Sequence, residues 1–299
     1  MTLARKVLMV EPEHFEVNPE IVSDNFFLKN ILLDKNKIRK NVLEEFSGLK
    51  TKLESAGIEV VSFRPHDEIP APDAVFPNNW FSTHPDATLV FYPMMSPLRR
   101  NERQPEIISF LKSHSKKTID LSENEIQNRF LEGTGSIVIE HKNKIAFASE
   151  SSRTNASLFF EWCKIMNHTP VLFHATDDDG HPVYHTNVIL TIAENFAILC
   201  SECIEDESEK EAVKEKLLDG GLKILEINFE QAKSFSGNAL ALKNKNGQAL
   251  VISEKGWNGF NASQKIILST LCSEIIVSPL PTIESCGGGS ARCMLAELF

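Results

Sequence analysis

The sequence predicts one α/β domain built from repeated hairpin, helix and strand units. Four pairs of short β-like runs joined by polar turns begin near residues 80, 136, 187 and 238, a period of roughly 50 residues. Helix-like stretches fill the gaps, and short strand candidates follow them. A regular period of this size is typical of a repeat architecture. We therefore predict a pseudo-fivefold α/β-propeller of ββαβ units that spans residues 1–299 as a single domain.

Each predicted element has its own local signal. The hairpins pair 80–84 with 88–92, 136–140 with 145–148, 187–192 with 196–200, and 238–242 with 249–252. The predicted helices are 36–56, 102–114, 154–167, 208–218 and 263–273. The strands expected after helices include 58–63, 170–173, 223–227 and 274–277. The runs 6–10 and 290–298 are expected to close the ring as its fifth unit.

Composition excludes several classes of protein. The chain has 31 basic and 41 acidic residues and a formal charge of −10, which argues against binding to nucleic acid or to anionic membranes. No apolar run approaches the roughly 20 residues of a membrane helix, and no signal peptide is predicted. The six cysteines are sparse and irregularly spaced, so we expect free thiols and a cytoplasmic protein.

The segment from Glu284 to Leu295 is the most unusual. Three consecutive glycines, 287–289, lie between Cys286 and Cys293, and such a run is costly unless the backbone needs unusual dihedrals or a close approach. A thiol at the junction of this loop and a final strand is a candidate nucleophile. The alternative is a buried structural cysteine.

A cysteine nucleophile needs a partner for proton transfer. Among nine histidines, His185 has the most suggestive position, where a loop enters a predicted strand, although a structural histidine would fit there too. Glu132 precedes the Gly133-Thr134-Gly135 turn and could orient that histidine. The cysteine and histidine spacings do not support a zinc site, and no dinucleotide or phosphate-loop signature is present, so we predict no metal and no cofactor.

The loop 72–81 reads Pro-Asp-Ala-Val-Phe-Pro-Asn-Asn-Trp-Phe. Its Asn78 and Asn79 offer amide donors and acceptors between aromatic residues, which suits recognition of a neutral polar group. An Asx-turn with its aromatic residues in the core is the alternative.

Taken together, these segments resemble the guanidino-group-modifying, or pentein, superfamily. The order matches over nearly the whole chain: the aromatic loop, the Glu-Gly turn, Arg153-Thr154-Asn155, the strand entry at His185, and the glycine loop that ends in Cys293-Met294. The resemblance implies the fivefold α/β-propeller. It also implies that Cys293 is the nucleophile, that His185 is the general acid and base, and that Glu132 is its carboxylate partner.

The chain departs from the guanidinium-binding members of that superfamily. Asn79 and Asn187 stand where those members, or some of them, carry aspartates. Amides pair well with a neutral ureido group but cannot compensate a buried cation. The sequence therefore looks like the citrulline-hydrolysing branch, in which the terminal ureido group yields ornithine, ammonia and carbon dioxide.

Two alternatives stay open. One is an arginine deiminase, dimethylarginine hydrolase or amidinotransferase that acts on a guanidinium, and the other is a non-catalytic binding protein of the same fold. Asp73 is expected to bind the amino-acid end of the substrate or to order its loop. The candidates for the α-carboxylate are Arg99, Arg100, Arg103 and Arg153. The expected partner is a small amino-acid substrate, and a homo-oligomer is possible.

Overall fold

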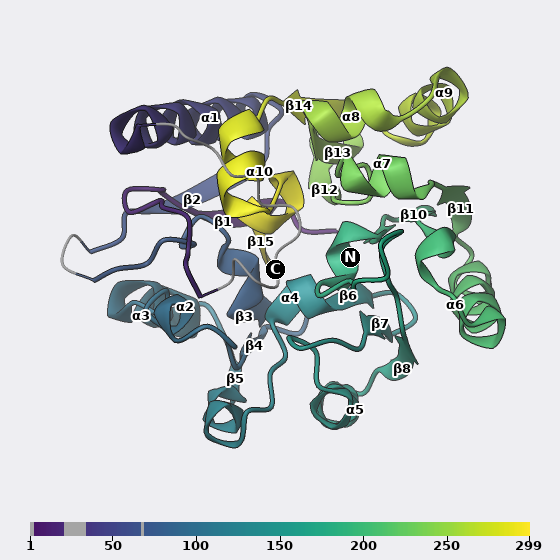
Figure 1. Cartoon of the computed structure of the whole chain (residues 1–299), viewed down its shortest axis with the longest axis horizontal. Coiled ribbons are helices and arrows are strands. Elements are labelled where there is room, and N and C mark those ends of the chain that lie inside the picture. The colour runs from purple at the N-terminus through teal and green to yellow at the C-terminus, as the bar shows by residue number, and fades with distance from the viewer. Residues whose placement is uncertain (1–2, 21–33, 67–68) are drawn as a thin grey trace.

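The computed structural model describes residues 3–20, 34–66 and 69–299. Within this part of the chain the strands form five three-stranded sheets, ordered β3-β4-β5, β6-β7-β8, β9-β10-β11, β12-β13-β14 and β15-β1-β2. In each sheet the central strand pairs antiparallel with one neighbour and parallel with the other. The sheets surround a common centre (Figure 1), which confirms the predicted repeat of ββαβ units.

The strands have the following bounds. The four internal sheets contain β3 (Phe81–Thr83), β4 (Thr88–Phe91), β5 (Lys117–Asp120), β6 (Ile137–Glu140), β7 (Ile145–Ser149), β8 (Thr169–Phe173), β9 (Leu190–Ile192), β10 (Phe196–Leu199), β11 (Lys223–Glu226), β12 (Leu240–Asn244), β13 (Gly247–Ser253) and β14 (Glu274–Ser278). The closing sheet contains β1 (Lys6–Val10), β2 (Glu59–Phe63) and β15 (Ala296–Leu298). Because β15 pairs with β1, the two ends of the chain meet in one sheet.

Helices link the parallel strands, as a parallel pair requires. These crossover helices are α1 (Lys35–Ser55), α3 (Pro105–Ser113), α5 (Ala156–Met166), α6 (Glu207–Asp219), α8 (Glu254–Gly259) and α9 (Ala262–Leu271). Most of them lie at the outside of the ring in Figure 1. In α1 one face of the helix is buried and the rest faces outward, which suits a place at the outside of the ring. Its buried residues recur at helical spacing and are Val42, Phe46, Leu49 and Leu53.

Short helical turns occupy the inner ends of the units. They are η1 (Pro77–Asn79), α4 (Gly133–Ser136), η3 (Thr186–Val188) and η5 (Ala291–Met294). η1 contacts α4 and η5, and α4 contacts η3. The predicted strands at 187–192, 238–242 and 290–298 were therefore wrong at their starts. Their first residues form turns, and β9, β12 and β15 begin two to six residues later.

Other elements had no counterpart among the predictions. They are β5, α2 (Pro97–Arg100), η2 (Ser122–Gln127), η4 (Ser201–Cys203), α7 (Phe229–Lys233), α8 and α10 (Pro281–Gly287). α3 starts at Pro105 rather than at 102, because proline occupies the first helical turn. Across the described ranges, no helix is both long and apolar enough to cross a membrane. The single domain over residues 1–299 stays a proposal.

Candidate active site

The inner turns bring most of the predicted site residues around one small cavity. Its lining consists of Asp73, Phe76, Asn79, Arg99, Arg153, Tyr184, His185, Val188, Gly287, Gly288, Gly289 and Cys293. Glu132 and Asn187 lie directly behind this lining, in contact with His185 and Cys293 respectively. Residues that are far apart in sequence thus meet at the centre of the ring.

Glu132 and His185 form a buried pair. Glu132 precedes α4 and His185 precedes η3, and the Glu132 Oε2 lies 2.8 Å from the His185 Nε2. The other carboxylate oxygen, Oε1, accepts a hydrogen bond of 3.0 Å from the backbone N–H of Met95. The carboxylate is therefore held from two sides and can fix the orientation of the imidazole.

Burial and charge set the protonation of this pair. Burial alone would raise the pKa of Glu132, but the His185 hydrogen bond and the charges of Arg153 and Arg99 outweigh it and lower that pKa to about 2. Burial lowers the pKa of His185 to about 4, although its contact with Glu132 acts in the opposite direction. At neutral pH the carboxylate is therefore ionised and the imidazole is neutral.

These states place the imidazole proton. An ionised carboxylate can only accept, so the Nε2 of His185 carries the proton and its Nδ1 keeps a free lone pair. Gly135 lies beside that ring: a Cβ at Gly135 would fall 3.0 Å from the His185 Nδ1 and 2.2 Å from the Asn79 Nδ2. The Gly-x-Gly turn thus lets the backbone approach both side chains closely.

Cys293 lies in η5 and its side chain is almost fully buried. Its Sγ lies 3.4 Å from the Nδ2 of Asn238 and 4.0 Å from the Nδ2 of Asn187. The other candidate thiol, Cys286, lies in α10, where its sulfur is 3.9 Å from the Ser285 hydroxyl. Among the described residues, Cys293 lines the cavity and Cys286 does not.

Arg153 presents unused donors at the cavity. The side chain is 2% exposed, its Cζ stacks 4.4 Å above the Tyr184 ring, and its Nη1 lies 3.8 Å from the Glu132 Oε2. Its Nε and Nη2 have no hydrogen-bond partner within the described part of the chain. Unsatisfied buried donors carry a desolvation cost that a ligand acceptor would relieve.

Asp73 provides a buried hydrogen-bond acceptor at the same cavity. Its Oδ2 accepts a hydrogen bond of 2.7 Å from the Nδ2 of Asn18, whereas its Oδ1 has no such partner among residues 3–20, 34–66 and 69–299. Burial raises the pKa of Asp73, and the Arg99 charge opposes this shift. The Oδ1 atom of Asn187 is a second buried acceptor without a partner in those ranges.

The Asn79 amide is already engaged by the protein. Its Oδ1 accepts a hydrogen bond of 3.0 Å from the Nη1 of Arg99, and its Nδ2 donates to the Glu132 carbonyl at 3.4 Å. Arg99 also bonds both carboxylate oxygens of Glu102 and the Phe76 carbonyl. Asn79 therefore lines the cavity as part of a fixed network rather than as a free amide.

Two predicted binding residues lie away from the cavity. Asn78 donates to the Thr134 hydroxyl at 3.4 Å and braces α4. Arg100 bonds the Met94 and Met95 carbonyls and pairs with Glu125 at 3.2 Å, so its guanidinium is held elsewhere. Neither residue lines the cavity, which argues against the substrate contacts predicted for them.

A further candidate, Arg103, is also engaged outside the cavity. It bonds the Tyr92 carbonyl and pairs with Glu125. Of the four candidate arginines, Arg153 alone both lines the cavity and has unpartnered donors in the described ranges.

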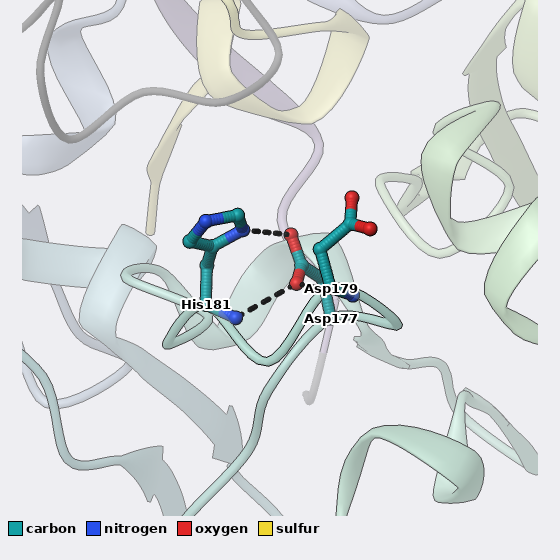
Figure 2. Close-up of side chains that lie close together, drawn as sticks. All are labelled: Asp177, Asp179 and His181. Atoms are coloured by element: carbon teal, nitrogen blue, oxygen red, sulfur yellow. Dashed lines mark hydrogen bonds and ion pairs between the residues drawn. The ribbon is translucent and has the colours of Figure 1, made fainter.

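A cluster of possible metal ligands lies in the loop after β8. Figure 2 shows the Asp177 carboxylate beside His181, with Asp179 next to them, and their ligand atoms lie within 4.8 Å of one another. Asp177 accepts hydrogen bonds from the backbone N–H groups of Asp179 and His181 at 3.0 and 2.9 Å. These bonds account for the turn, so we assign no metal to it, and the absence of a metal stays a prediction.

The family model for eukaryotic N,N-dimethylarginine dimethylhydrolase matches residues 11–299. The chain belongs to this family. No curated protein matches the chain by sequence. Membership places the chain in the pentein superfamily and confirms the resemblance inferred from its motifs.

Solved structures show the same fold. The arginine dihydrolase ArgZ, from the ornithine-ammonia cycle in cyanobacteria, superposes with a TM-score of 0.77 at 16% identity, over 97% of this chain and 40% of that one. This chain thus spans about two fifths of the full ArgZ length. The N-terminal domain of ArgZ bound to product gives a TM-score of 0.78 at 16% identity, covering 98% and 97%.

A dimethylarginine dimethylaminohydrolase with a chloropyridine adduct gives a TM-score of 0.68 at 15% identity, covering both chains fully. At these identities the structural matches show the fold alone. The family match supports an enzyme of the hydrolase class. It favours the guanidinium alternative over citrulline as the substrate.

Proposed function

We propose that the chain is a cysteine hydrolase that breaks C–N bonds at the terminal carbon of an arginine-like amino acid. Arginine is the substrate that we propose first, ahead of citrulline. One observation carries this proposal: the Glu132–His185 pair and the Cys293 thiol meet at one buried cavity that also holds unpartnered donors of Arg153. The family match to dimethylarginine dimethylhydrolases supports a guanidino substrate.

The chemistry follows from these groups. The neutral His185 imidazole takes the proton of the Cys293 thiol, and the resulting thiolate attacks the guanidinium carbon and forms a C–S bond. Ammonia leaves with a proton delivered by His185. The neutral imidazole then takes a proton from water, the hydroxide adds to the same carbon, and the C–S bond breaks. Arginine and one water give citrulline and ammonia. A second water, acting at the ureido carbon, gives ornithine, ammonia and carbon dioxide.

Arg153 is the proposed receptor for the α-carboxylate, because a guanidinium with two free donors matches a carboxylate in a bidentate pair. Asp73 is the proposed acceptor for the α-ammonium group through its Oδ1. Together the two side chains complement the zwitterionic end of an amino acid.

Arg153→Lys tests that role. Lysine keeps the positive charge near Glu132 but loses the two parallel N–H donors of the guanidinium. We therefore expect KM to rise by roughly 10- to 150-fold, the equivalent of about 1.5–3 kcal/mol, with a smaller change in kcat. Arg100→Lys is the matched control, because the Arg100 guanidinium is bound outside the cavity. Its KM should equal that of the unmodified protein. Equal KM values in all three proteins would remove Arg153 from the carboxylate site.

Citrulline remains the second candidate substrate. Two observations favour it. Asn79 and Asn187 provide neutral amides, whereas a buried guanidinium would need carboxylates to compensate its charge. The Oδ1 of Asn187 also has no partner among the described residues and could accept a hydrogen bond from a ureido N–H. A site of this kind would discriminate strongly against a buried cation.

One assay decides between them. Release of ammonia, dimethylamine, citrulline and ornithine is measured with arginine, citrulline and dimethylarginine, using Cys293→Ser and Cys286→Ser as paired variants. We expect turnover of arginine, lost by about 10³-fold or more in Cys293→Ser and retained in Cys286→Ser. A kcat/KM much higher for citrulline than for arginine would replace the first substrate by the second. No turnover of any of them would favour a binding protein.

A further inference from the structure

Asn238 was not among the residues predicted from sequence, yet it touches the Cys293 sulfur. It lies in the turn before β12, it is fully buried, and its Nδ2 is 3.4 Å from the Sγ. The preceding Gly237 lets this turn pack on η3, since a Cβ there would meet the Val188 carbonyl oxygen at 2.3 Å. The backbone therefore holds Asn238 against the inner face of the neighbouring unit.

The hydrogen bonds fix which end of the amide faces the sulfur. The Oδ1 of Asn238 accepts from the backbone N–H of Arg292 at 3.2 Å, so this atom is the carbonyl oxygen. The Nδ2 donates to the backbone carbonyl of Asn187 at 3.0 Å and has one hydrogen left for the sulfur. A flip of the amide would replace both backbone bonds by repulsive contacts. The amide atom nearer to the Cys293 sulfur is thus an N–H donor at 3.4 Å, and the Oδ1 lies farther away at 3.7 Å, where it can accept only from the neutral thiol.

The other amide near the sulfur is less constrained. The Nδ2 of Asn187 lies farther away, at 4.0 Å, and its Oδ1 has no partner among the described residues. Asn187 is therefore available to a substrate, whereas Asn238 is committed to the protein and to the thiol. Asn238 also bonds the residue next to the nucleophile, so it ties the sulfur and its backbone to η3.

We infer that Asn238 is a positioning residue for the nucleophile, which donates a hydrogen bond to the Cys293 thiolate and sets the direction of its sulfur. This inference rests on the proposed role of Cys293 as nucleophile. A donor at this distance favours the anionic sulfur, because hydrogen bonds to a charged acceptor are stronger than those to a neutral one. The thiolate is the reactive form.

The test measures alkylation of Cys293 by iodoacetamide as a function of pH, read by mass spectrometry of the peptide that contains it. Asn238→Asp keeps an acceptor for the Arg292 N–H but places a carboxylate against the sulfur. Asn238→Ser removes the amide donor without a change in charge, because its hydroxyl ends one atom closer to the backbone. We expect the pH midpoint of alkylation to rise by about one to two pH units in the serine variant, and by more in the aspartate variant.

Asn261→Asp is the matched control, because Asn261 caps α9 and aspartate caps a helix equally well. Its midpoint should equal that of the unmodified protein. A merely structural role of Asn238 would lower thermal stability without moving the midpoint, so unchanged midpoints in either folded variant would overturn the inference. The measurement needs no turnover, and a failure to hydrolyse arginine or citrulline would leave it intact as a test of Asn238.

Discussion

A negative charge at position 187 would act directly on Cys293, the proposed nucleophile. In Asn187→Asp a carboxylate oxygen replaces the amide nitrogen that lies 4.0 Å from the Cys293 Sγ. At this distance, with an effective dielectric constant of about 20, two like charges repel by about 4 kcal/mol. That repulsion corresponds to roughly three pH units in the ionisation of the thiol. We therefore expect the midpoint of Cys293 alkylation to rise by about this amount.

The matched variant is Asn187→Ala, which removes the amide without adding a charge. Its midpoint should move by less than about one pH unit, since a long contact of 4.0 Å contributes little. A Cys286→Ser background removes a second thiol from the labelling. If the aspartate and alanine variants shift alike, the charge at this site does not reach the sulfur and the electrostatic reasoning is refuted.

The same change has a consequence for substrate choice. A guanidinium would compensate the new carboxylate, whereas a neutral ureido group would not. The ratio of kcat/KM for arginine to that for citrulline should therefore rise in Asn187→Asp, and further in the double variant with Asn79→Asp. A ratio that falls would contradict the role of these amides in setting the charge of the site.

Three further predictions concern the carboxylate–imidazole pair and its support. Glu132→Gln should lower kcat by roughly 10²–10⁴-fold in ornithine release, because the His185 Nε2–H loses its ionised acceptor; near-normal turnover would exclude the pair from catalysis. Gly135→Ala should cost about 1–3 kcal/mol in urea unfolding and slow turnover, since the new methyl would fall 2.2 Å from the Asn79 Nδ2; an unperturbed variant would refute the close packing. Because burial lowers the pKa of His185 to about 4, the unfolded chain binds this proton first, and the free energy of unfolding should fall by up to about 3 kcal/mol between pH 6.5 and 4. His185→Gln should flatten that part of the pH profile.

The repeat could be predicted because its hairpins and crossover helices have local signals. The predicted hairpin of 238–242 and 249–252 forms as β12 and β13, with Lys245 and Asn246 as its turn and Gly247 already paired with Asn244. α10 was not predicted, since the run up to Gly287 reads as a loop, whereas Pro281 starts a helix and Gly288 ends it at φ +67°. β5 escaped notice because three of its four residues are exposed, so it lacks an apolar run.

The site was only partly visible in the sequence. Cys293, His185 and Asn79 line one cavity, as their motifs suggested. Asn238 was hidden because its role depends on contacts with Asn187 and Arg292 from other units, which no local pattern encodes. One signal was available: this asparagine, like Asn79, stands two residues before the first strand of its sheet.

The sheet that joins β15 to β1 also has a consequence for biosynthesis. Lys6 pairs with Leu298, so this ladder cannot form until residue 298 has been made. Cys293 lies three residues before β15, and Thr83 of the neighbouring sheet bonds the Glu297 carbonyl at 2.9 Å. Contacts of such long range form slowly. On a ribosome the first four sheets can assemble while the nucleophile is still unplaced. A chain that ends before residue 293 would therefore hold Glu132 and His185 without the Cys293 thiol, and the proposed activity would be absent until the closing sheet forms.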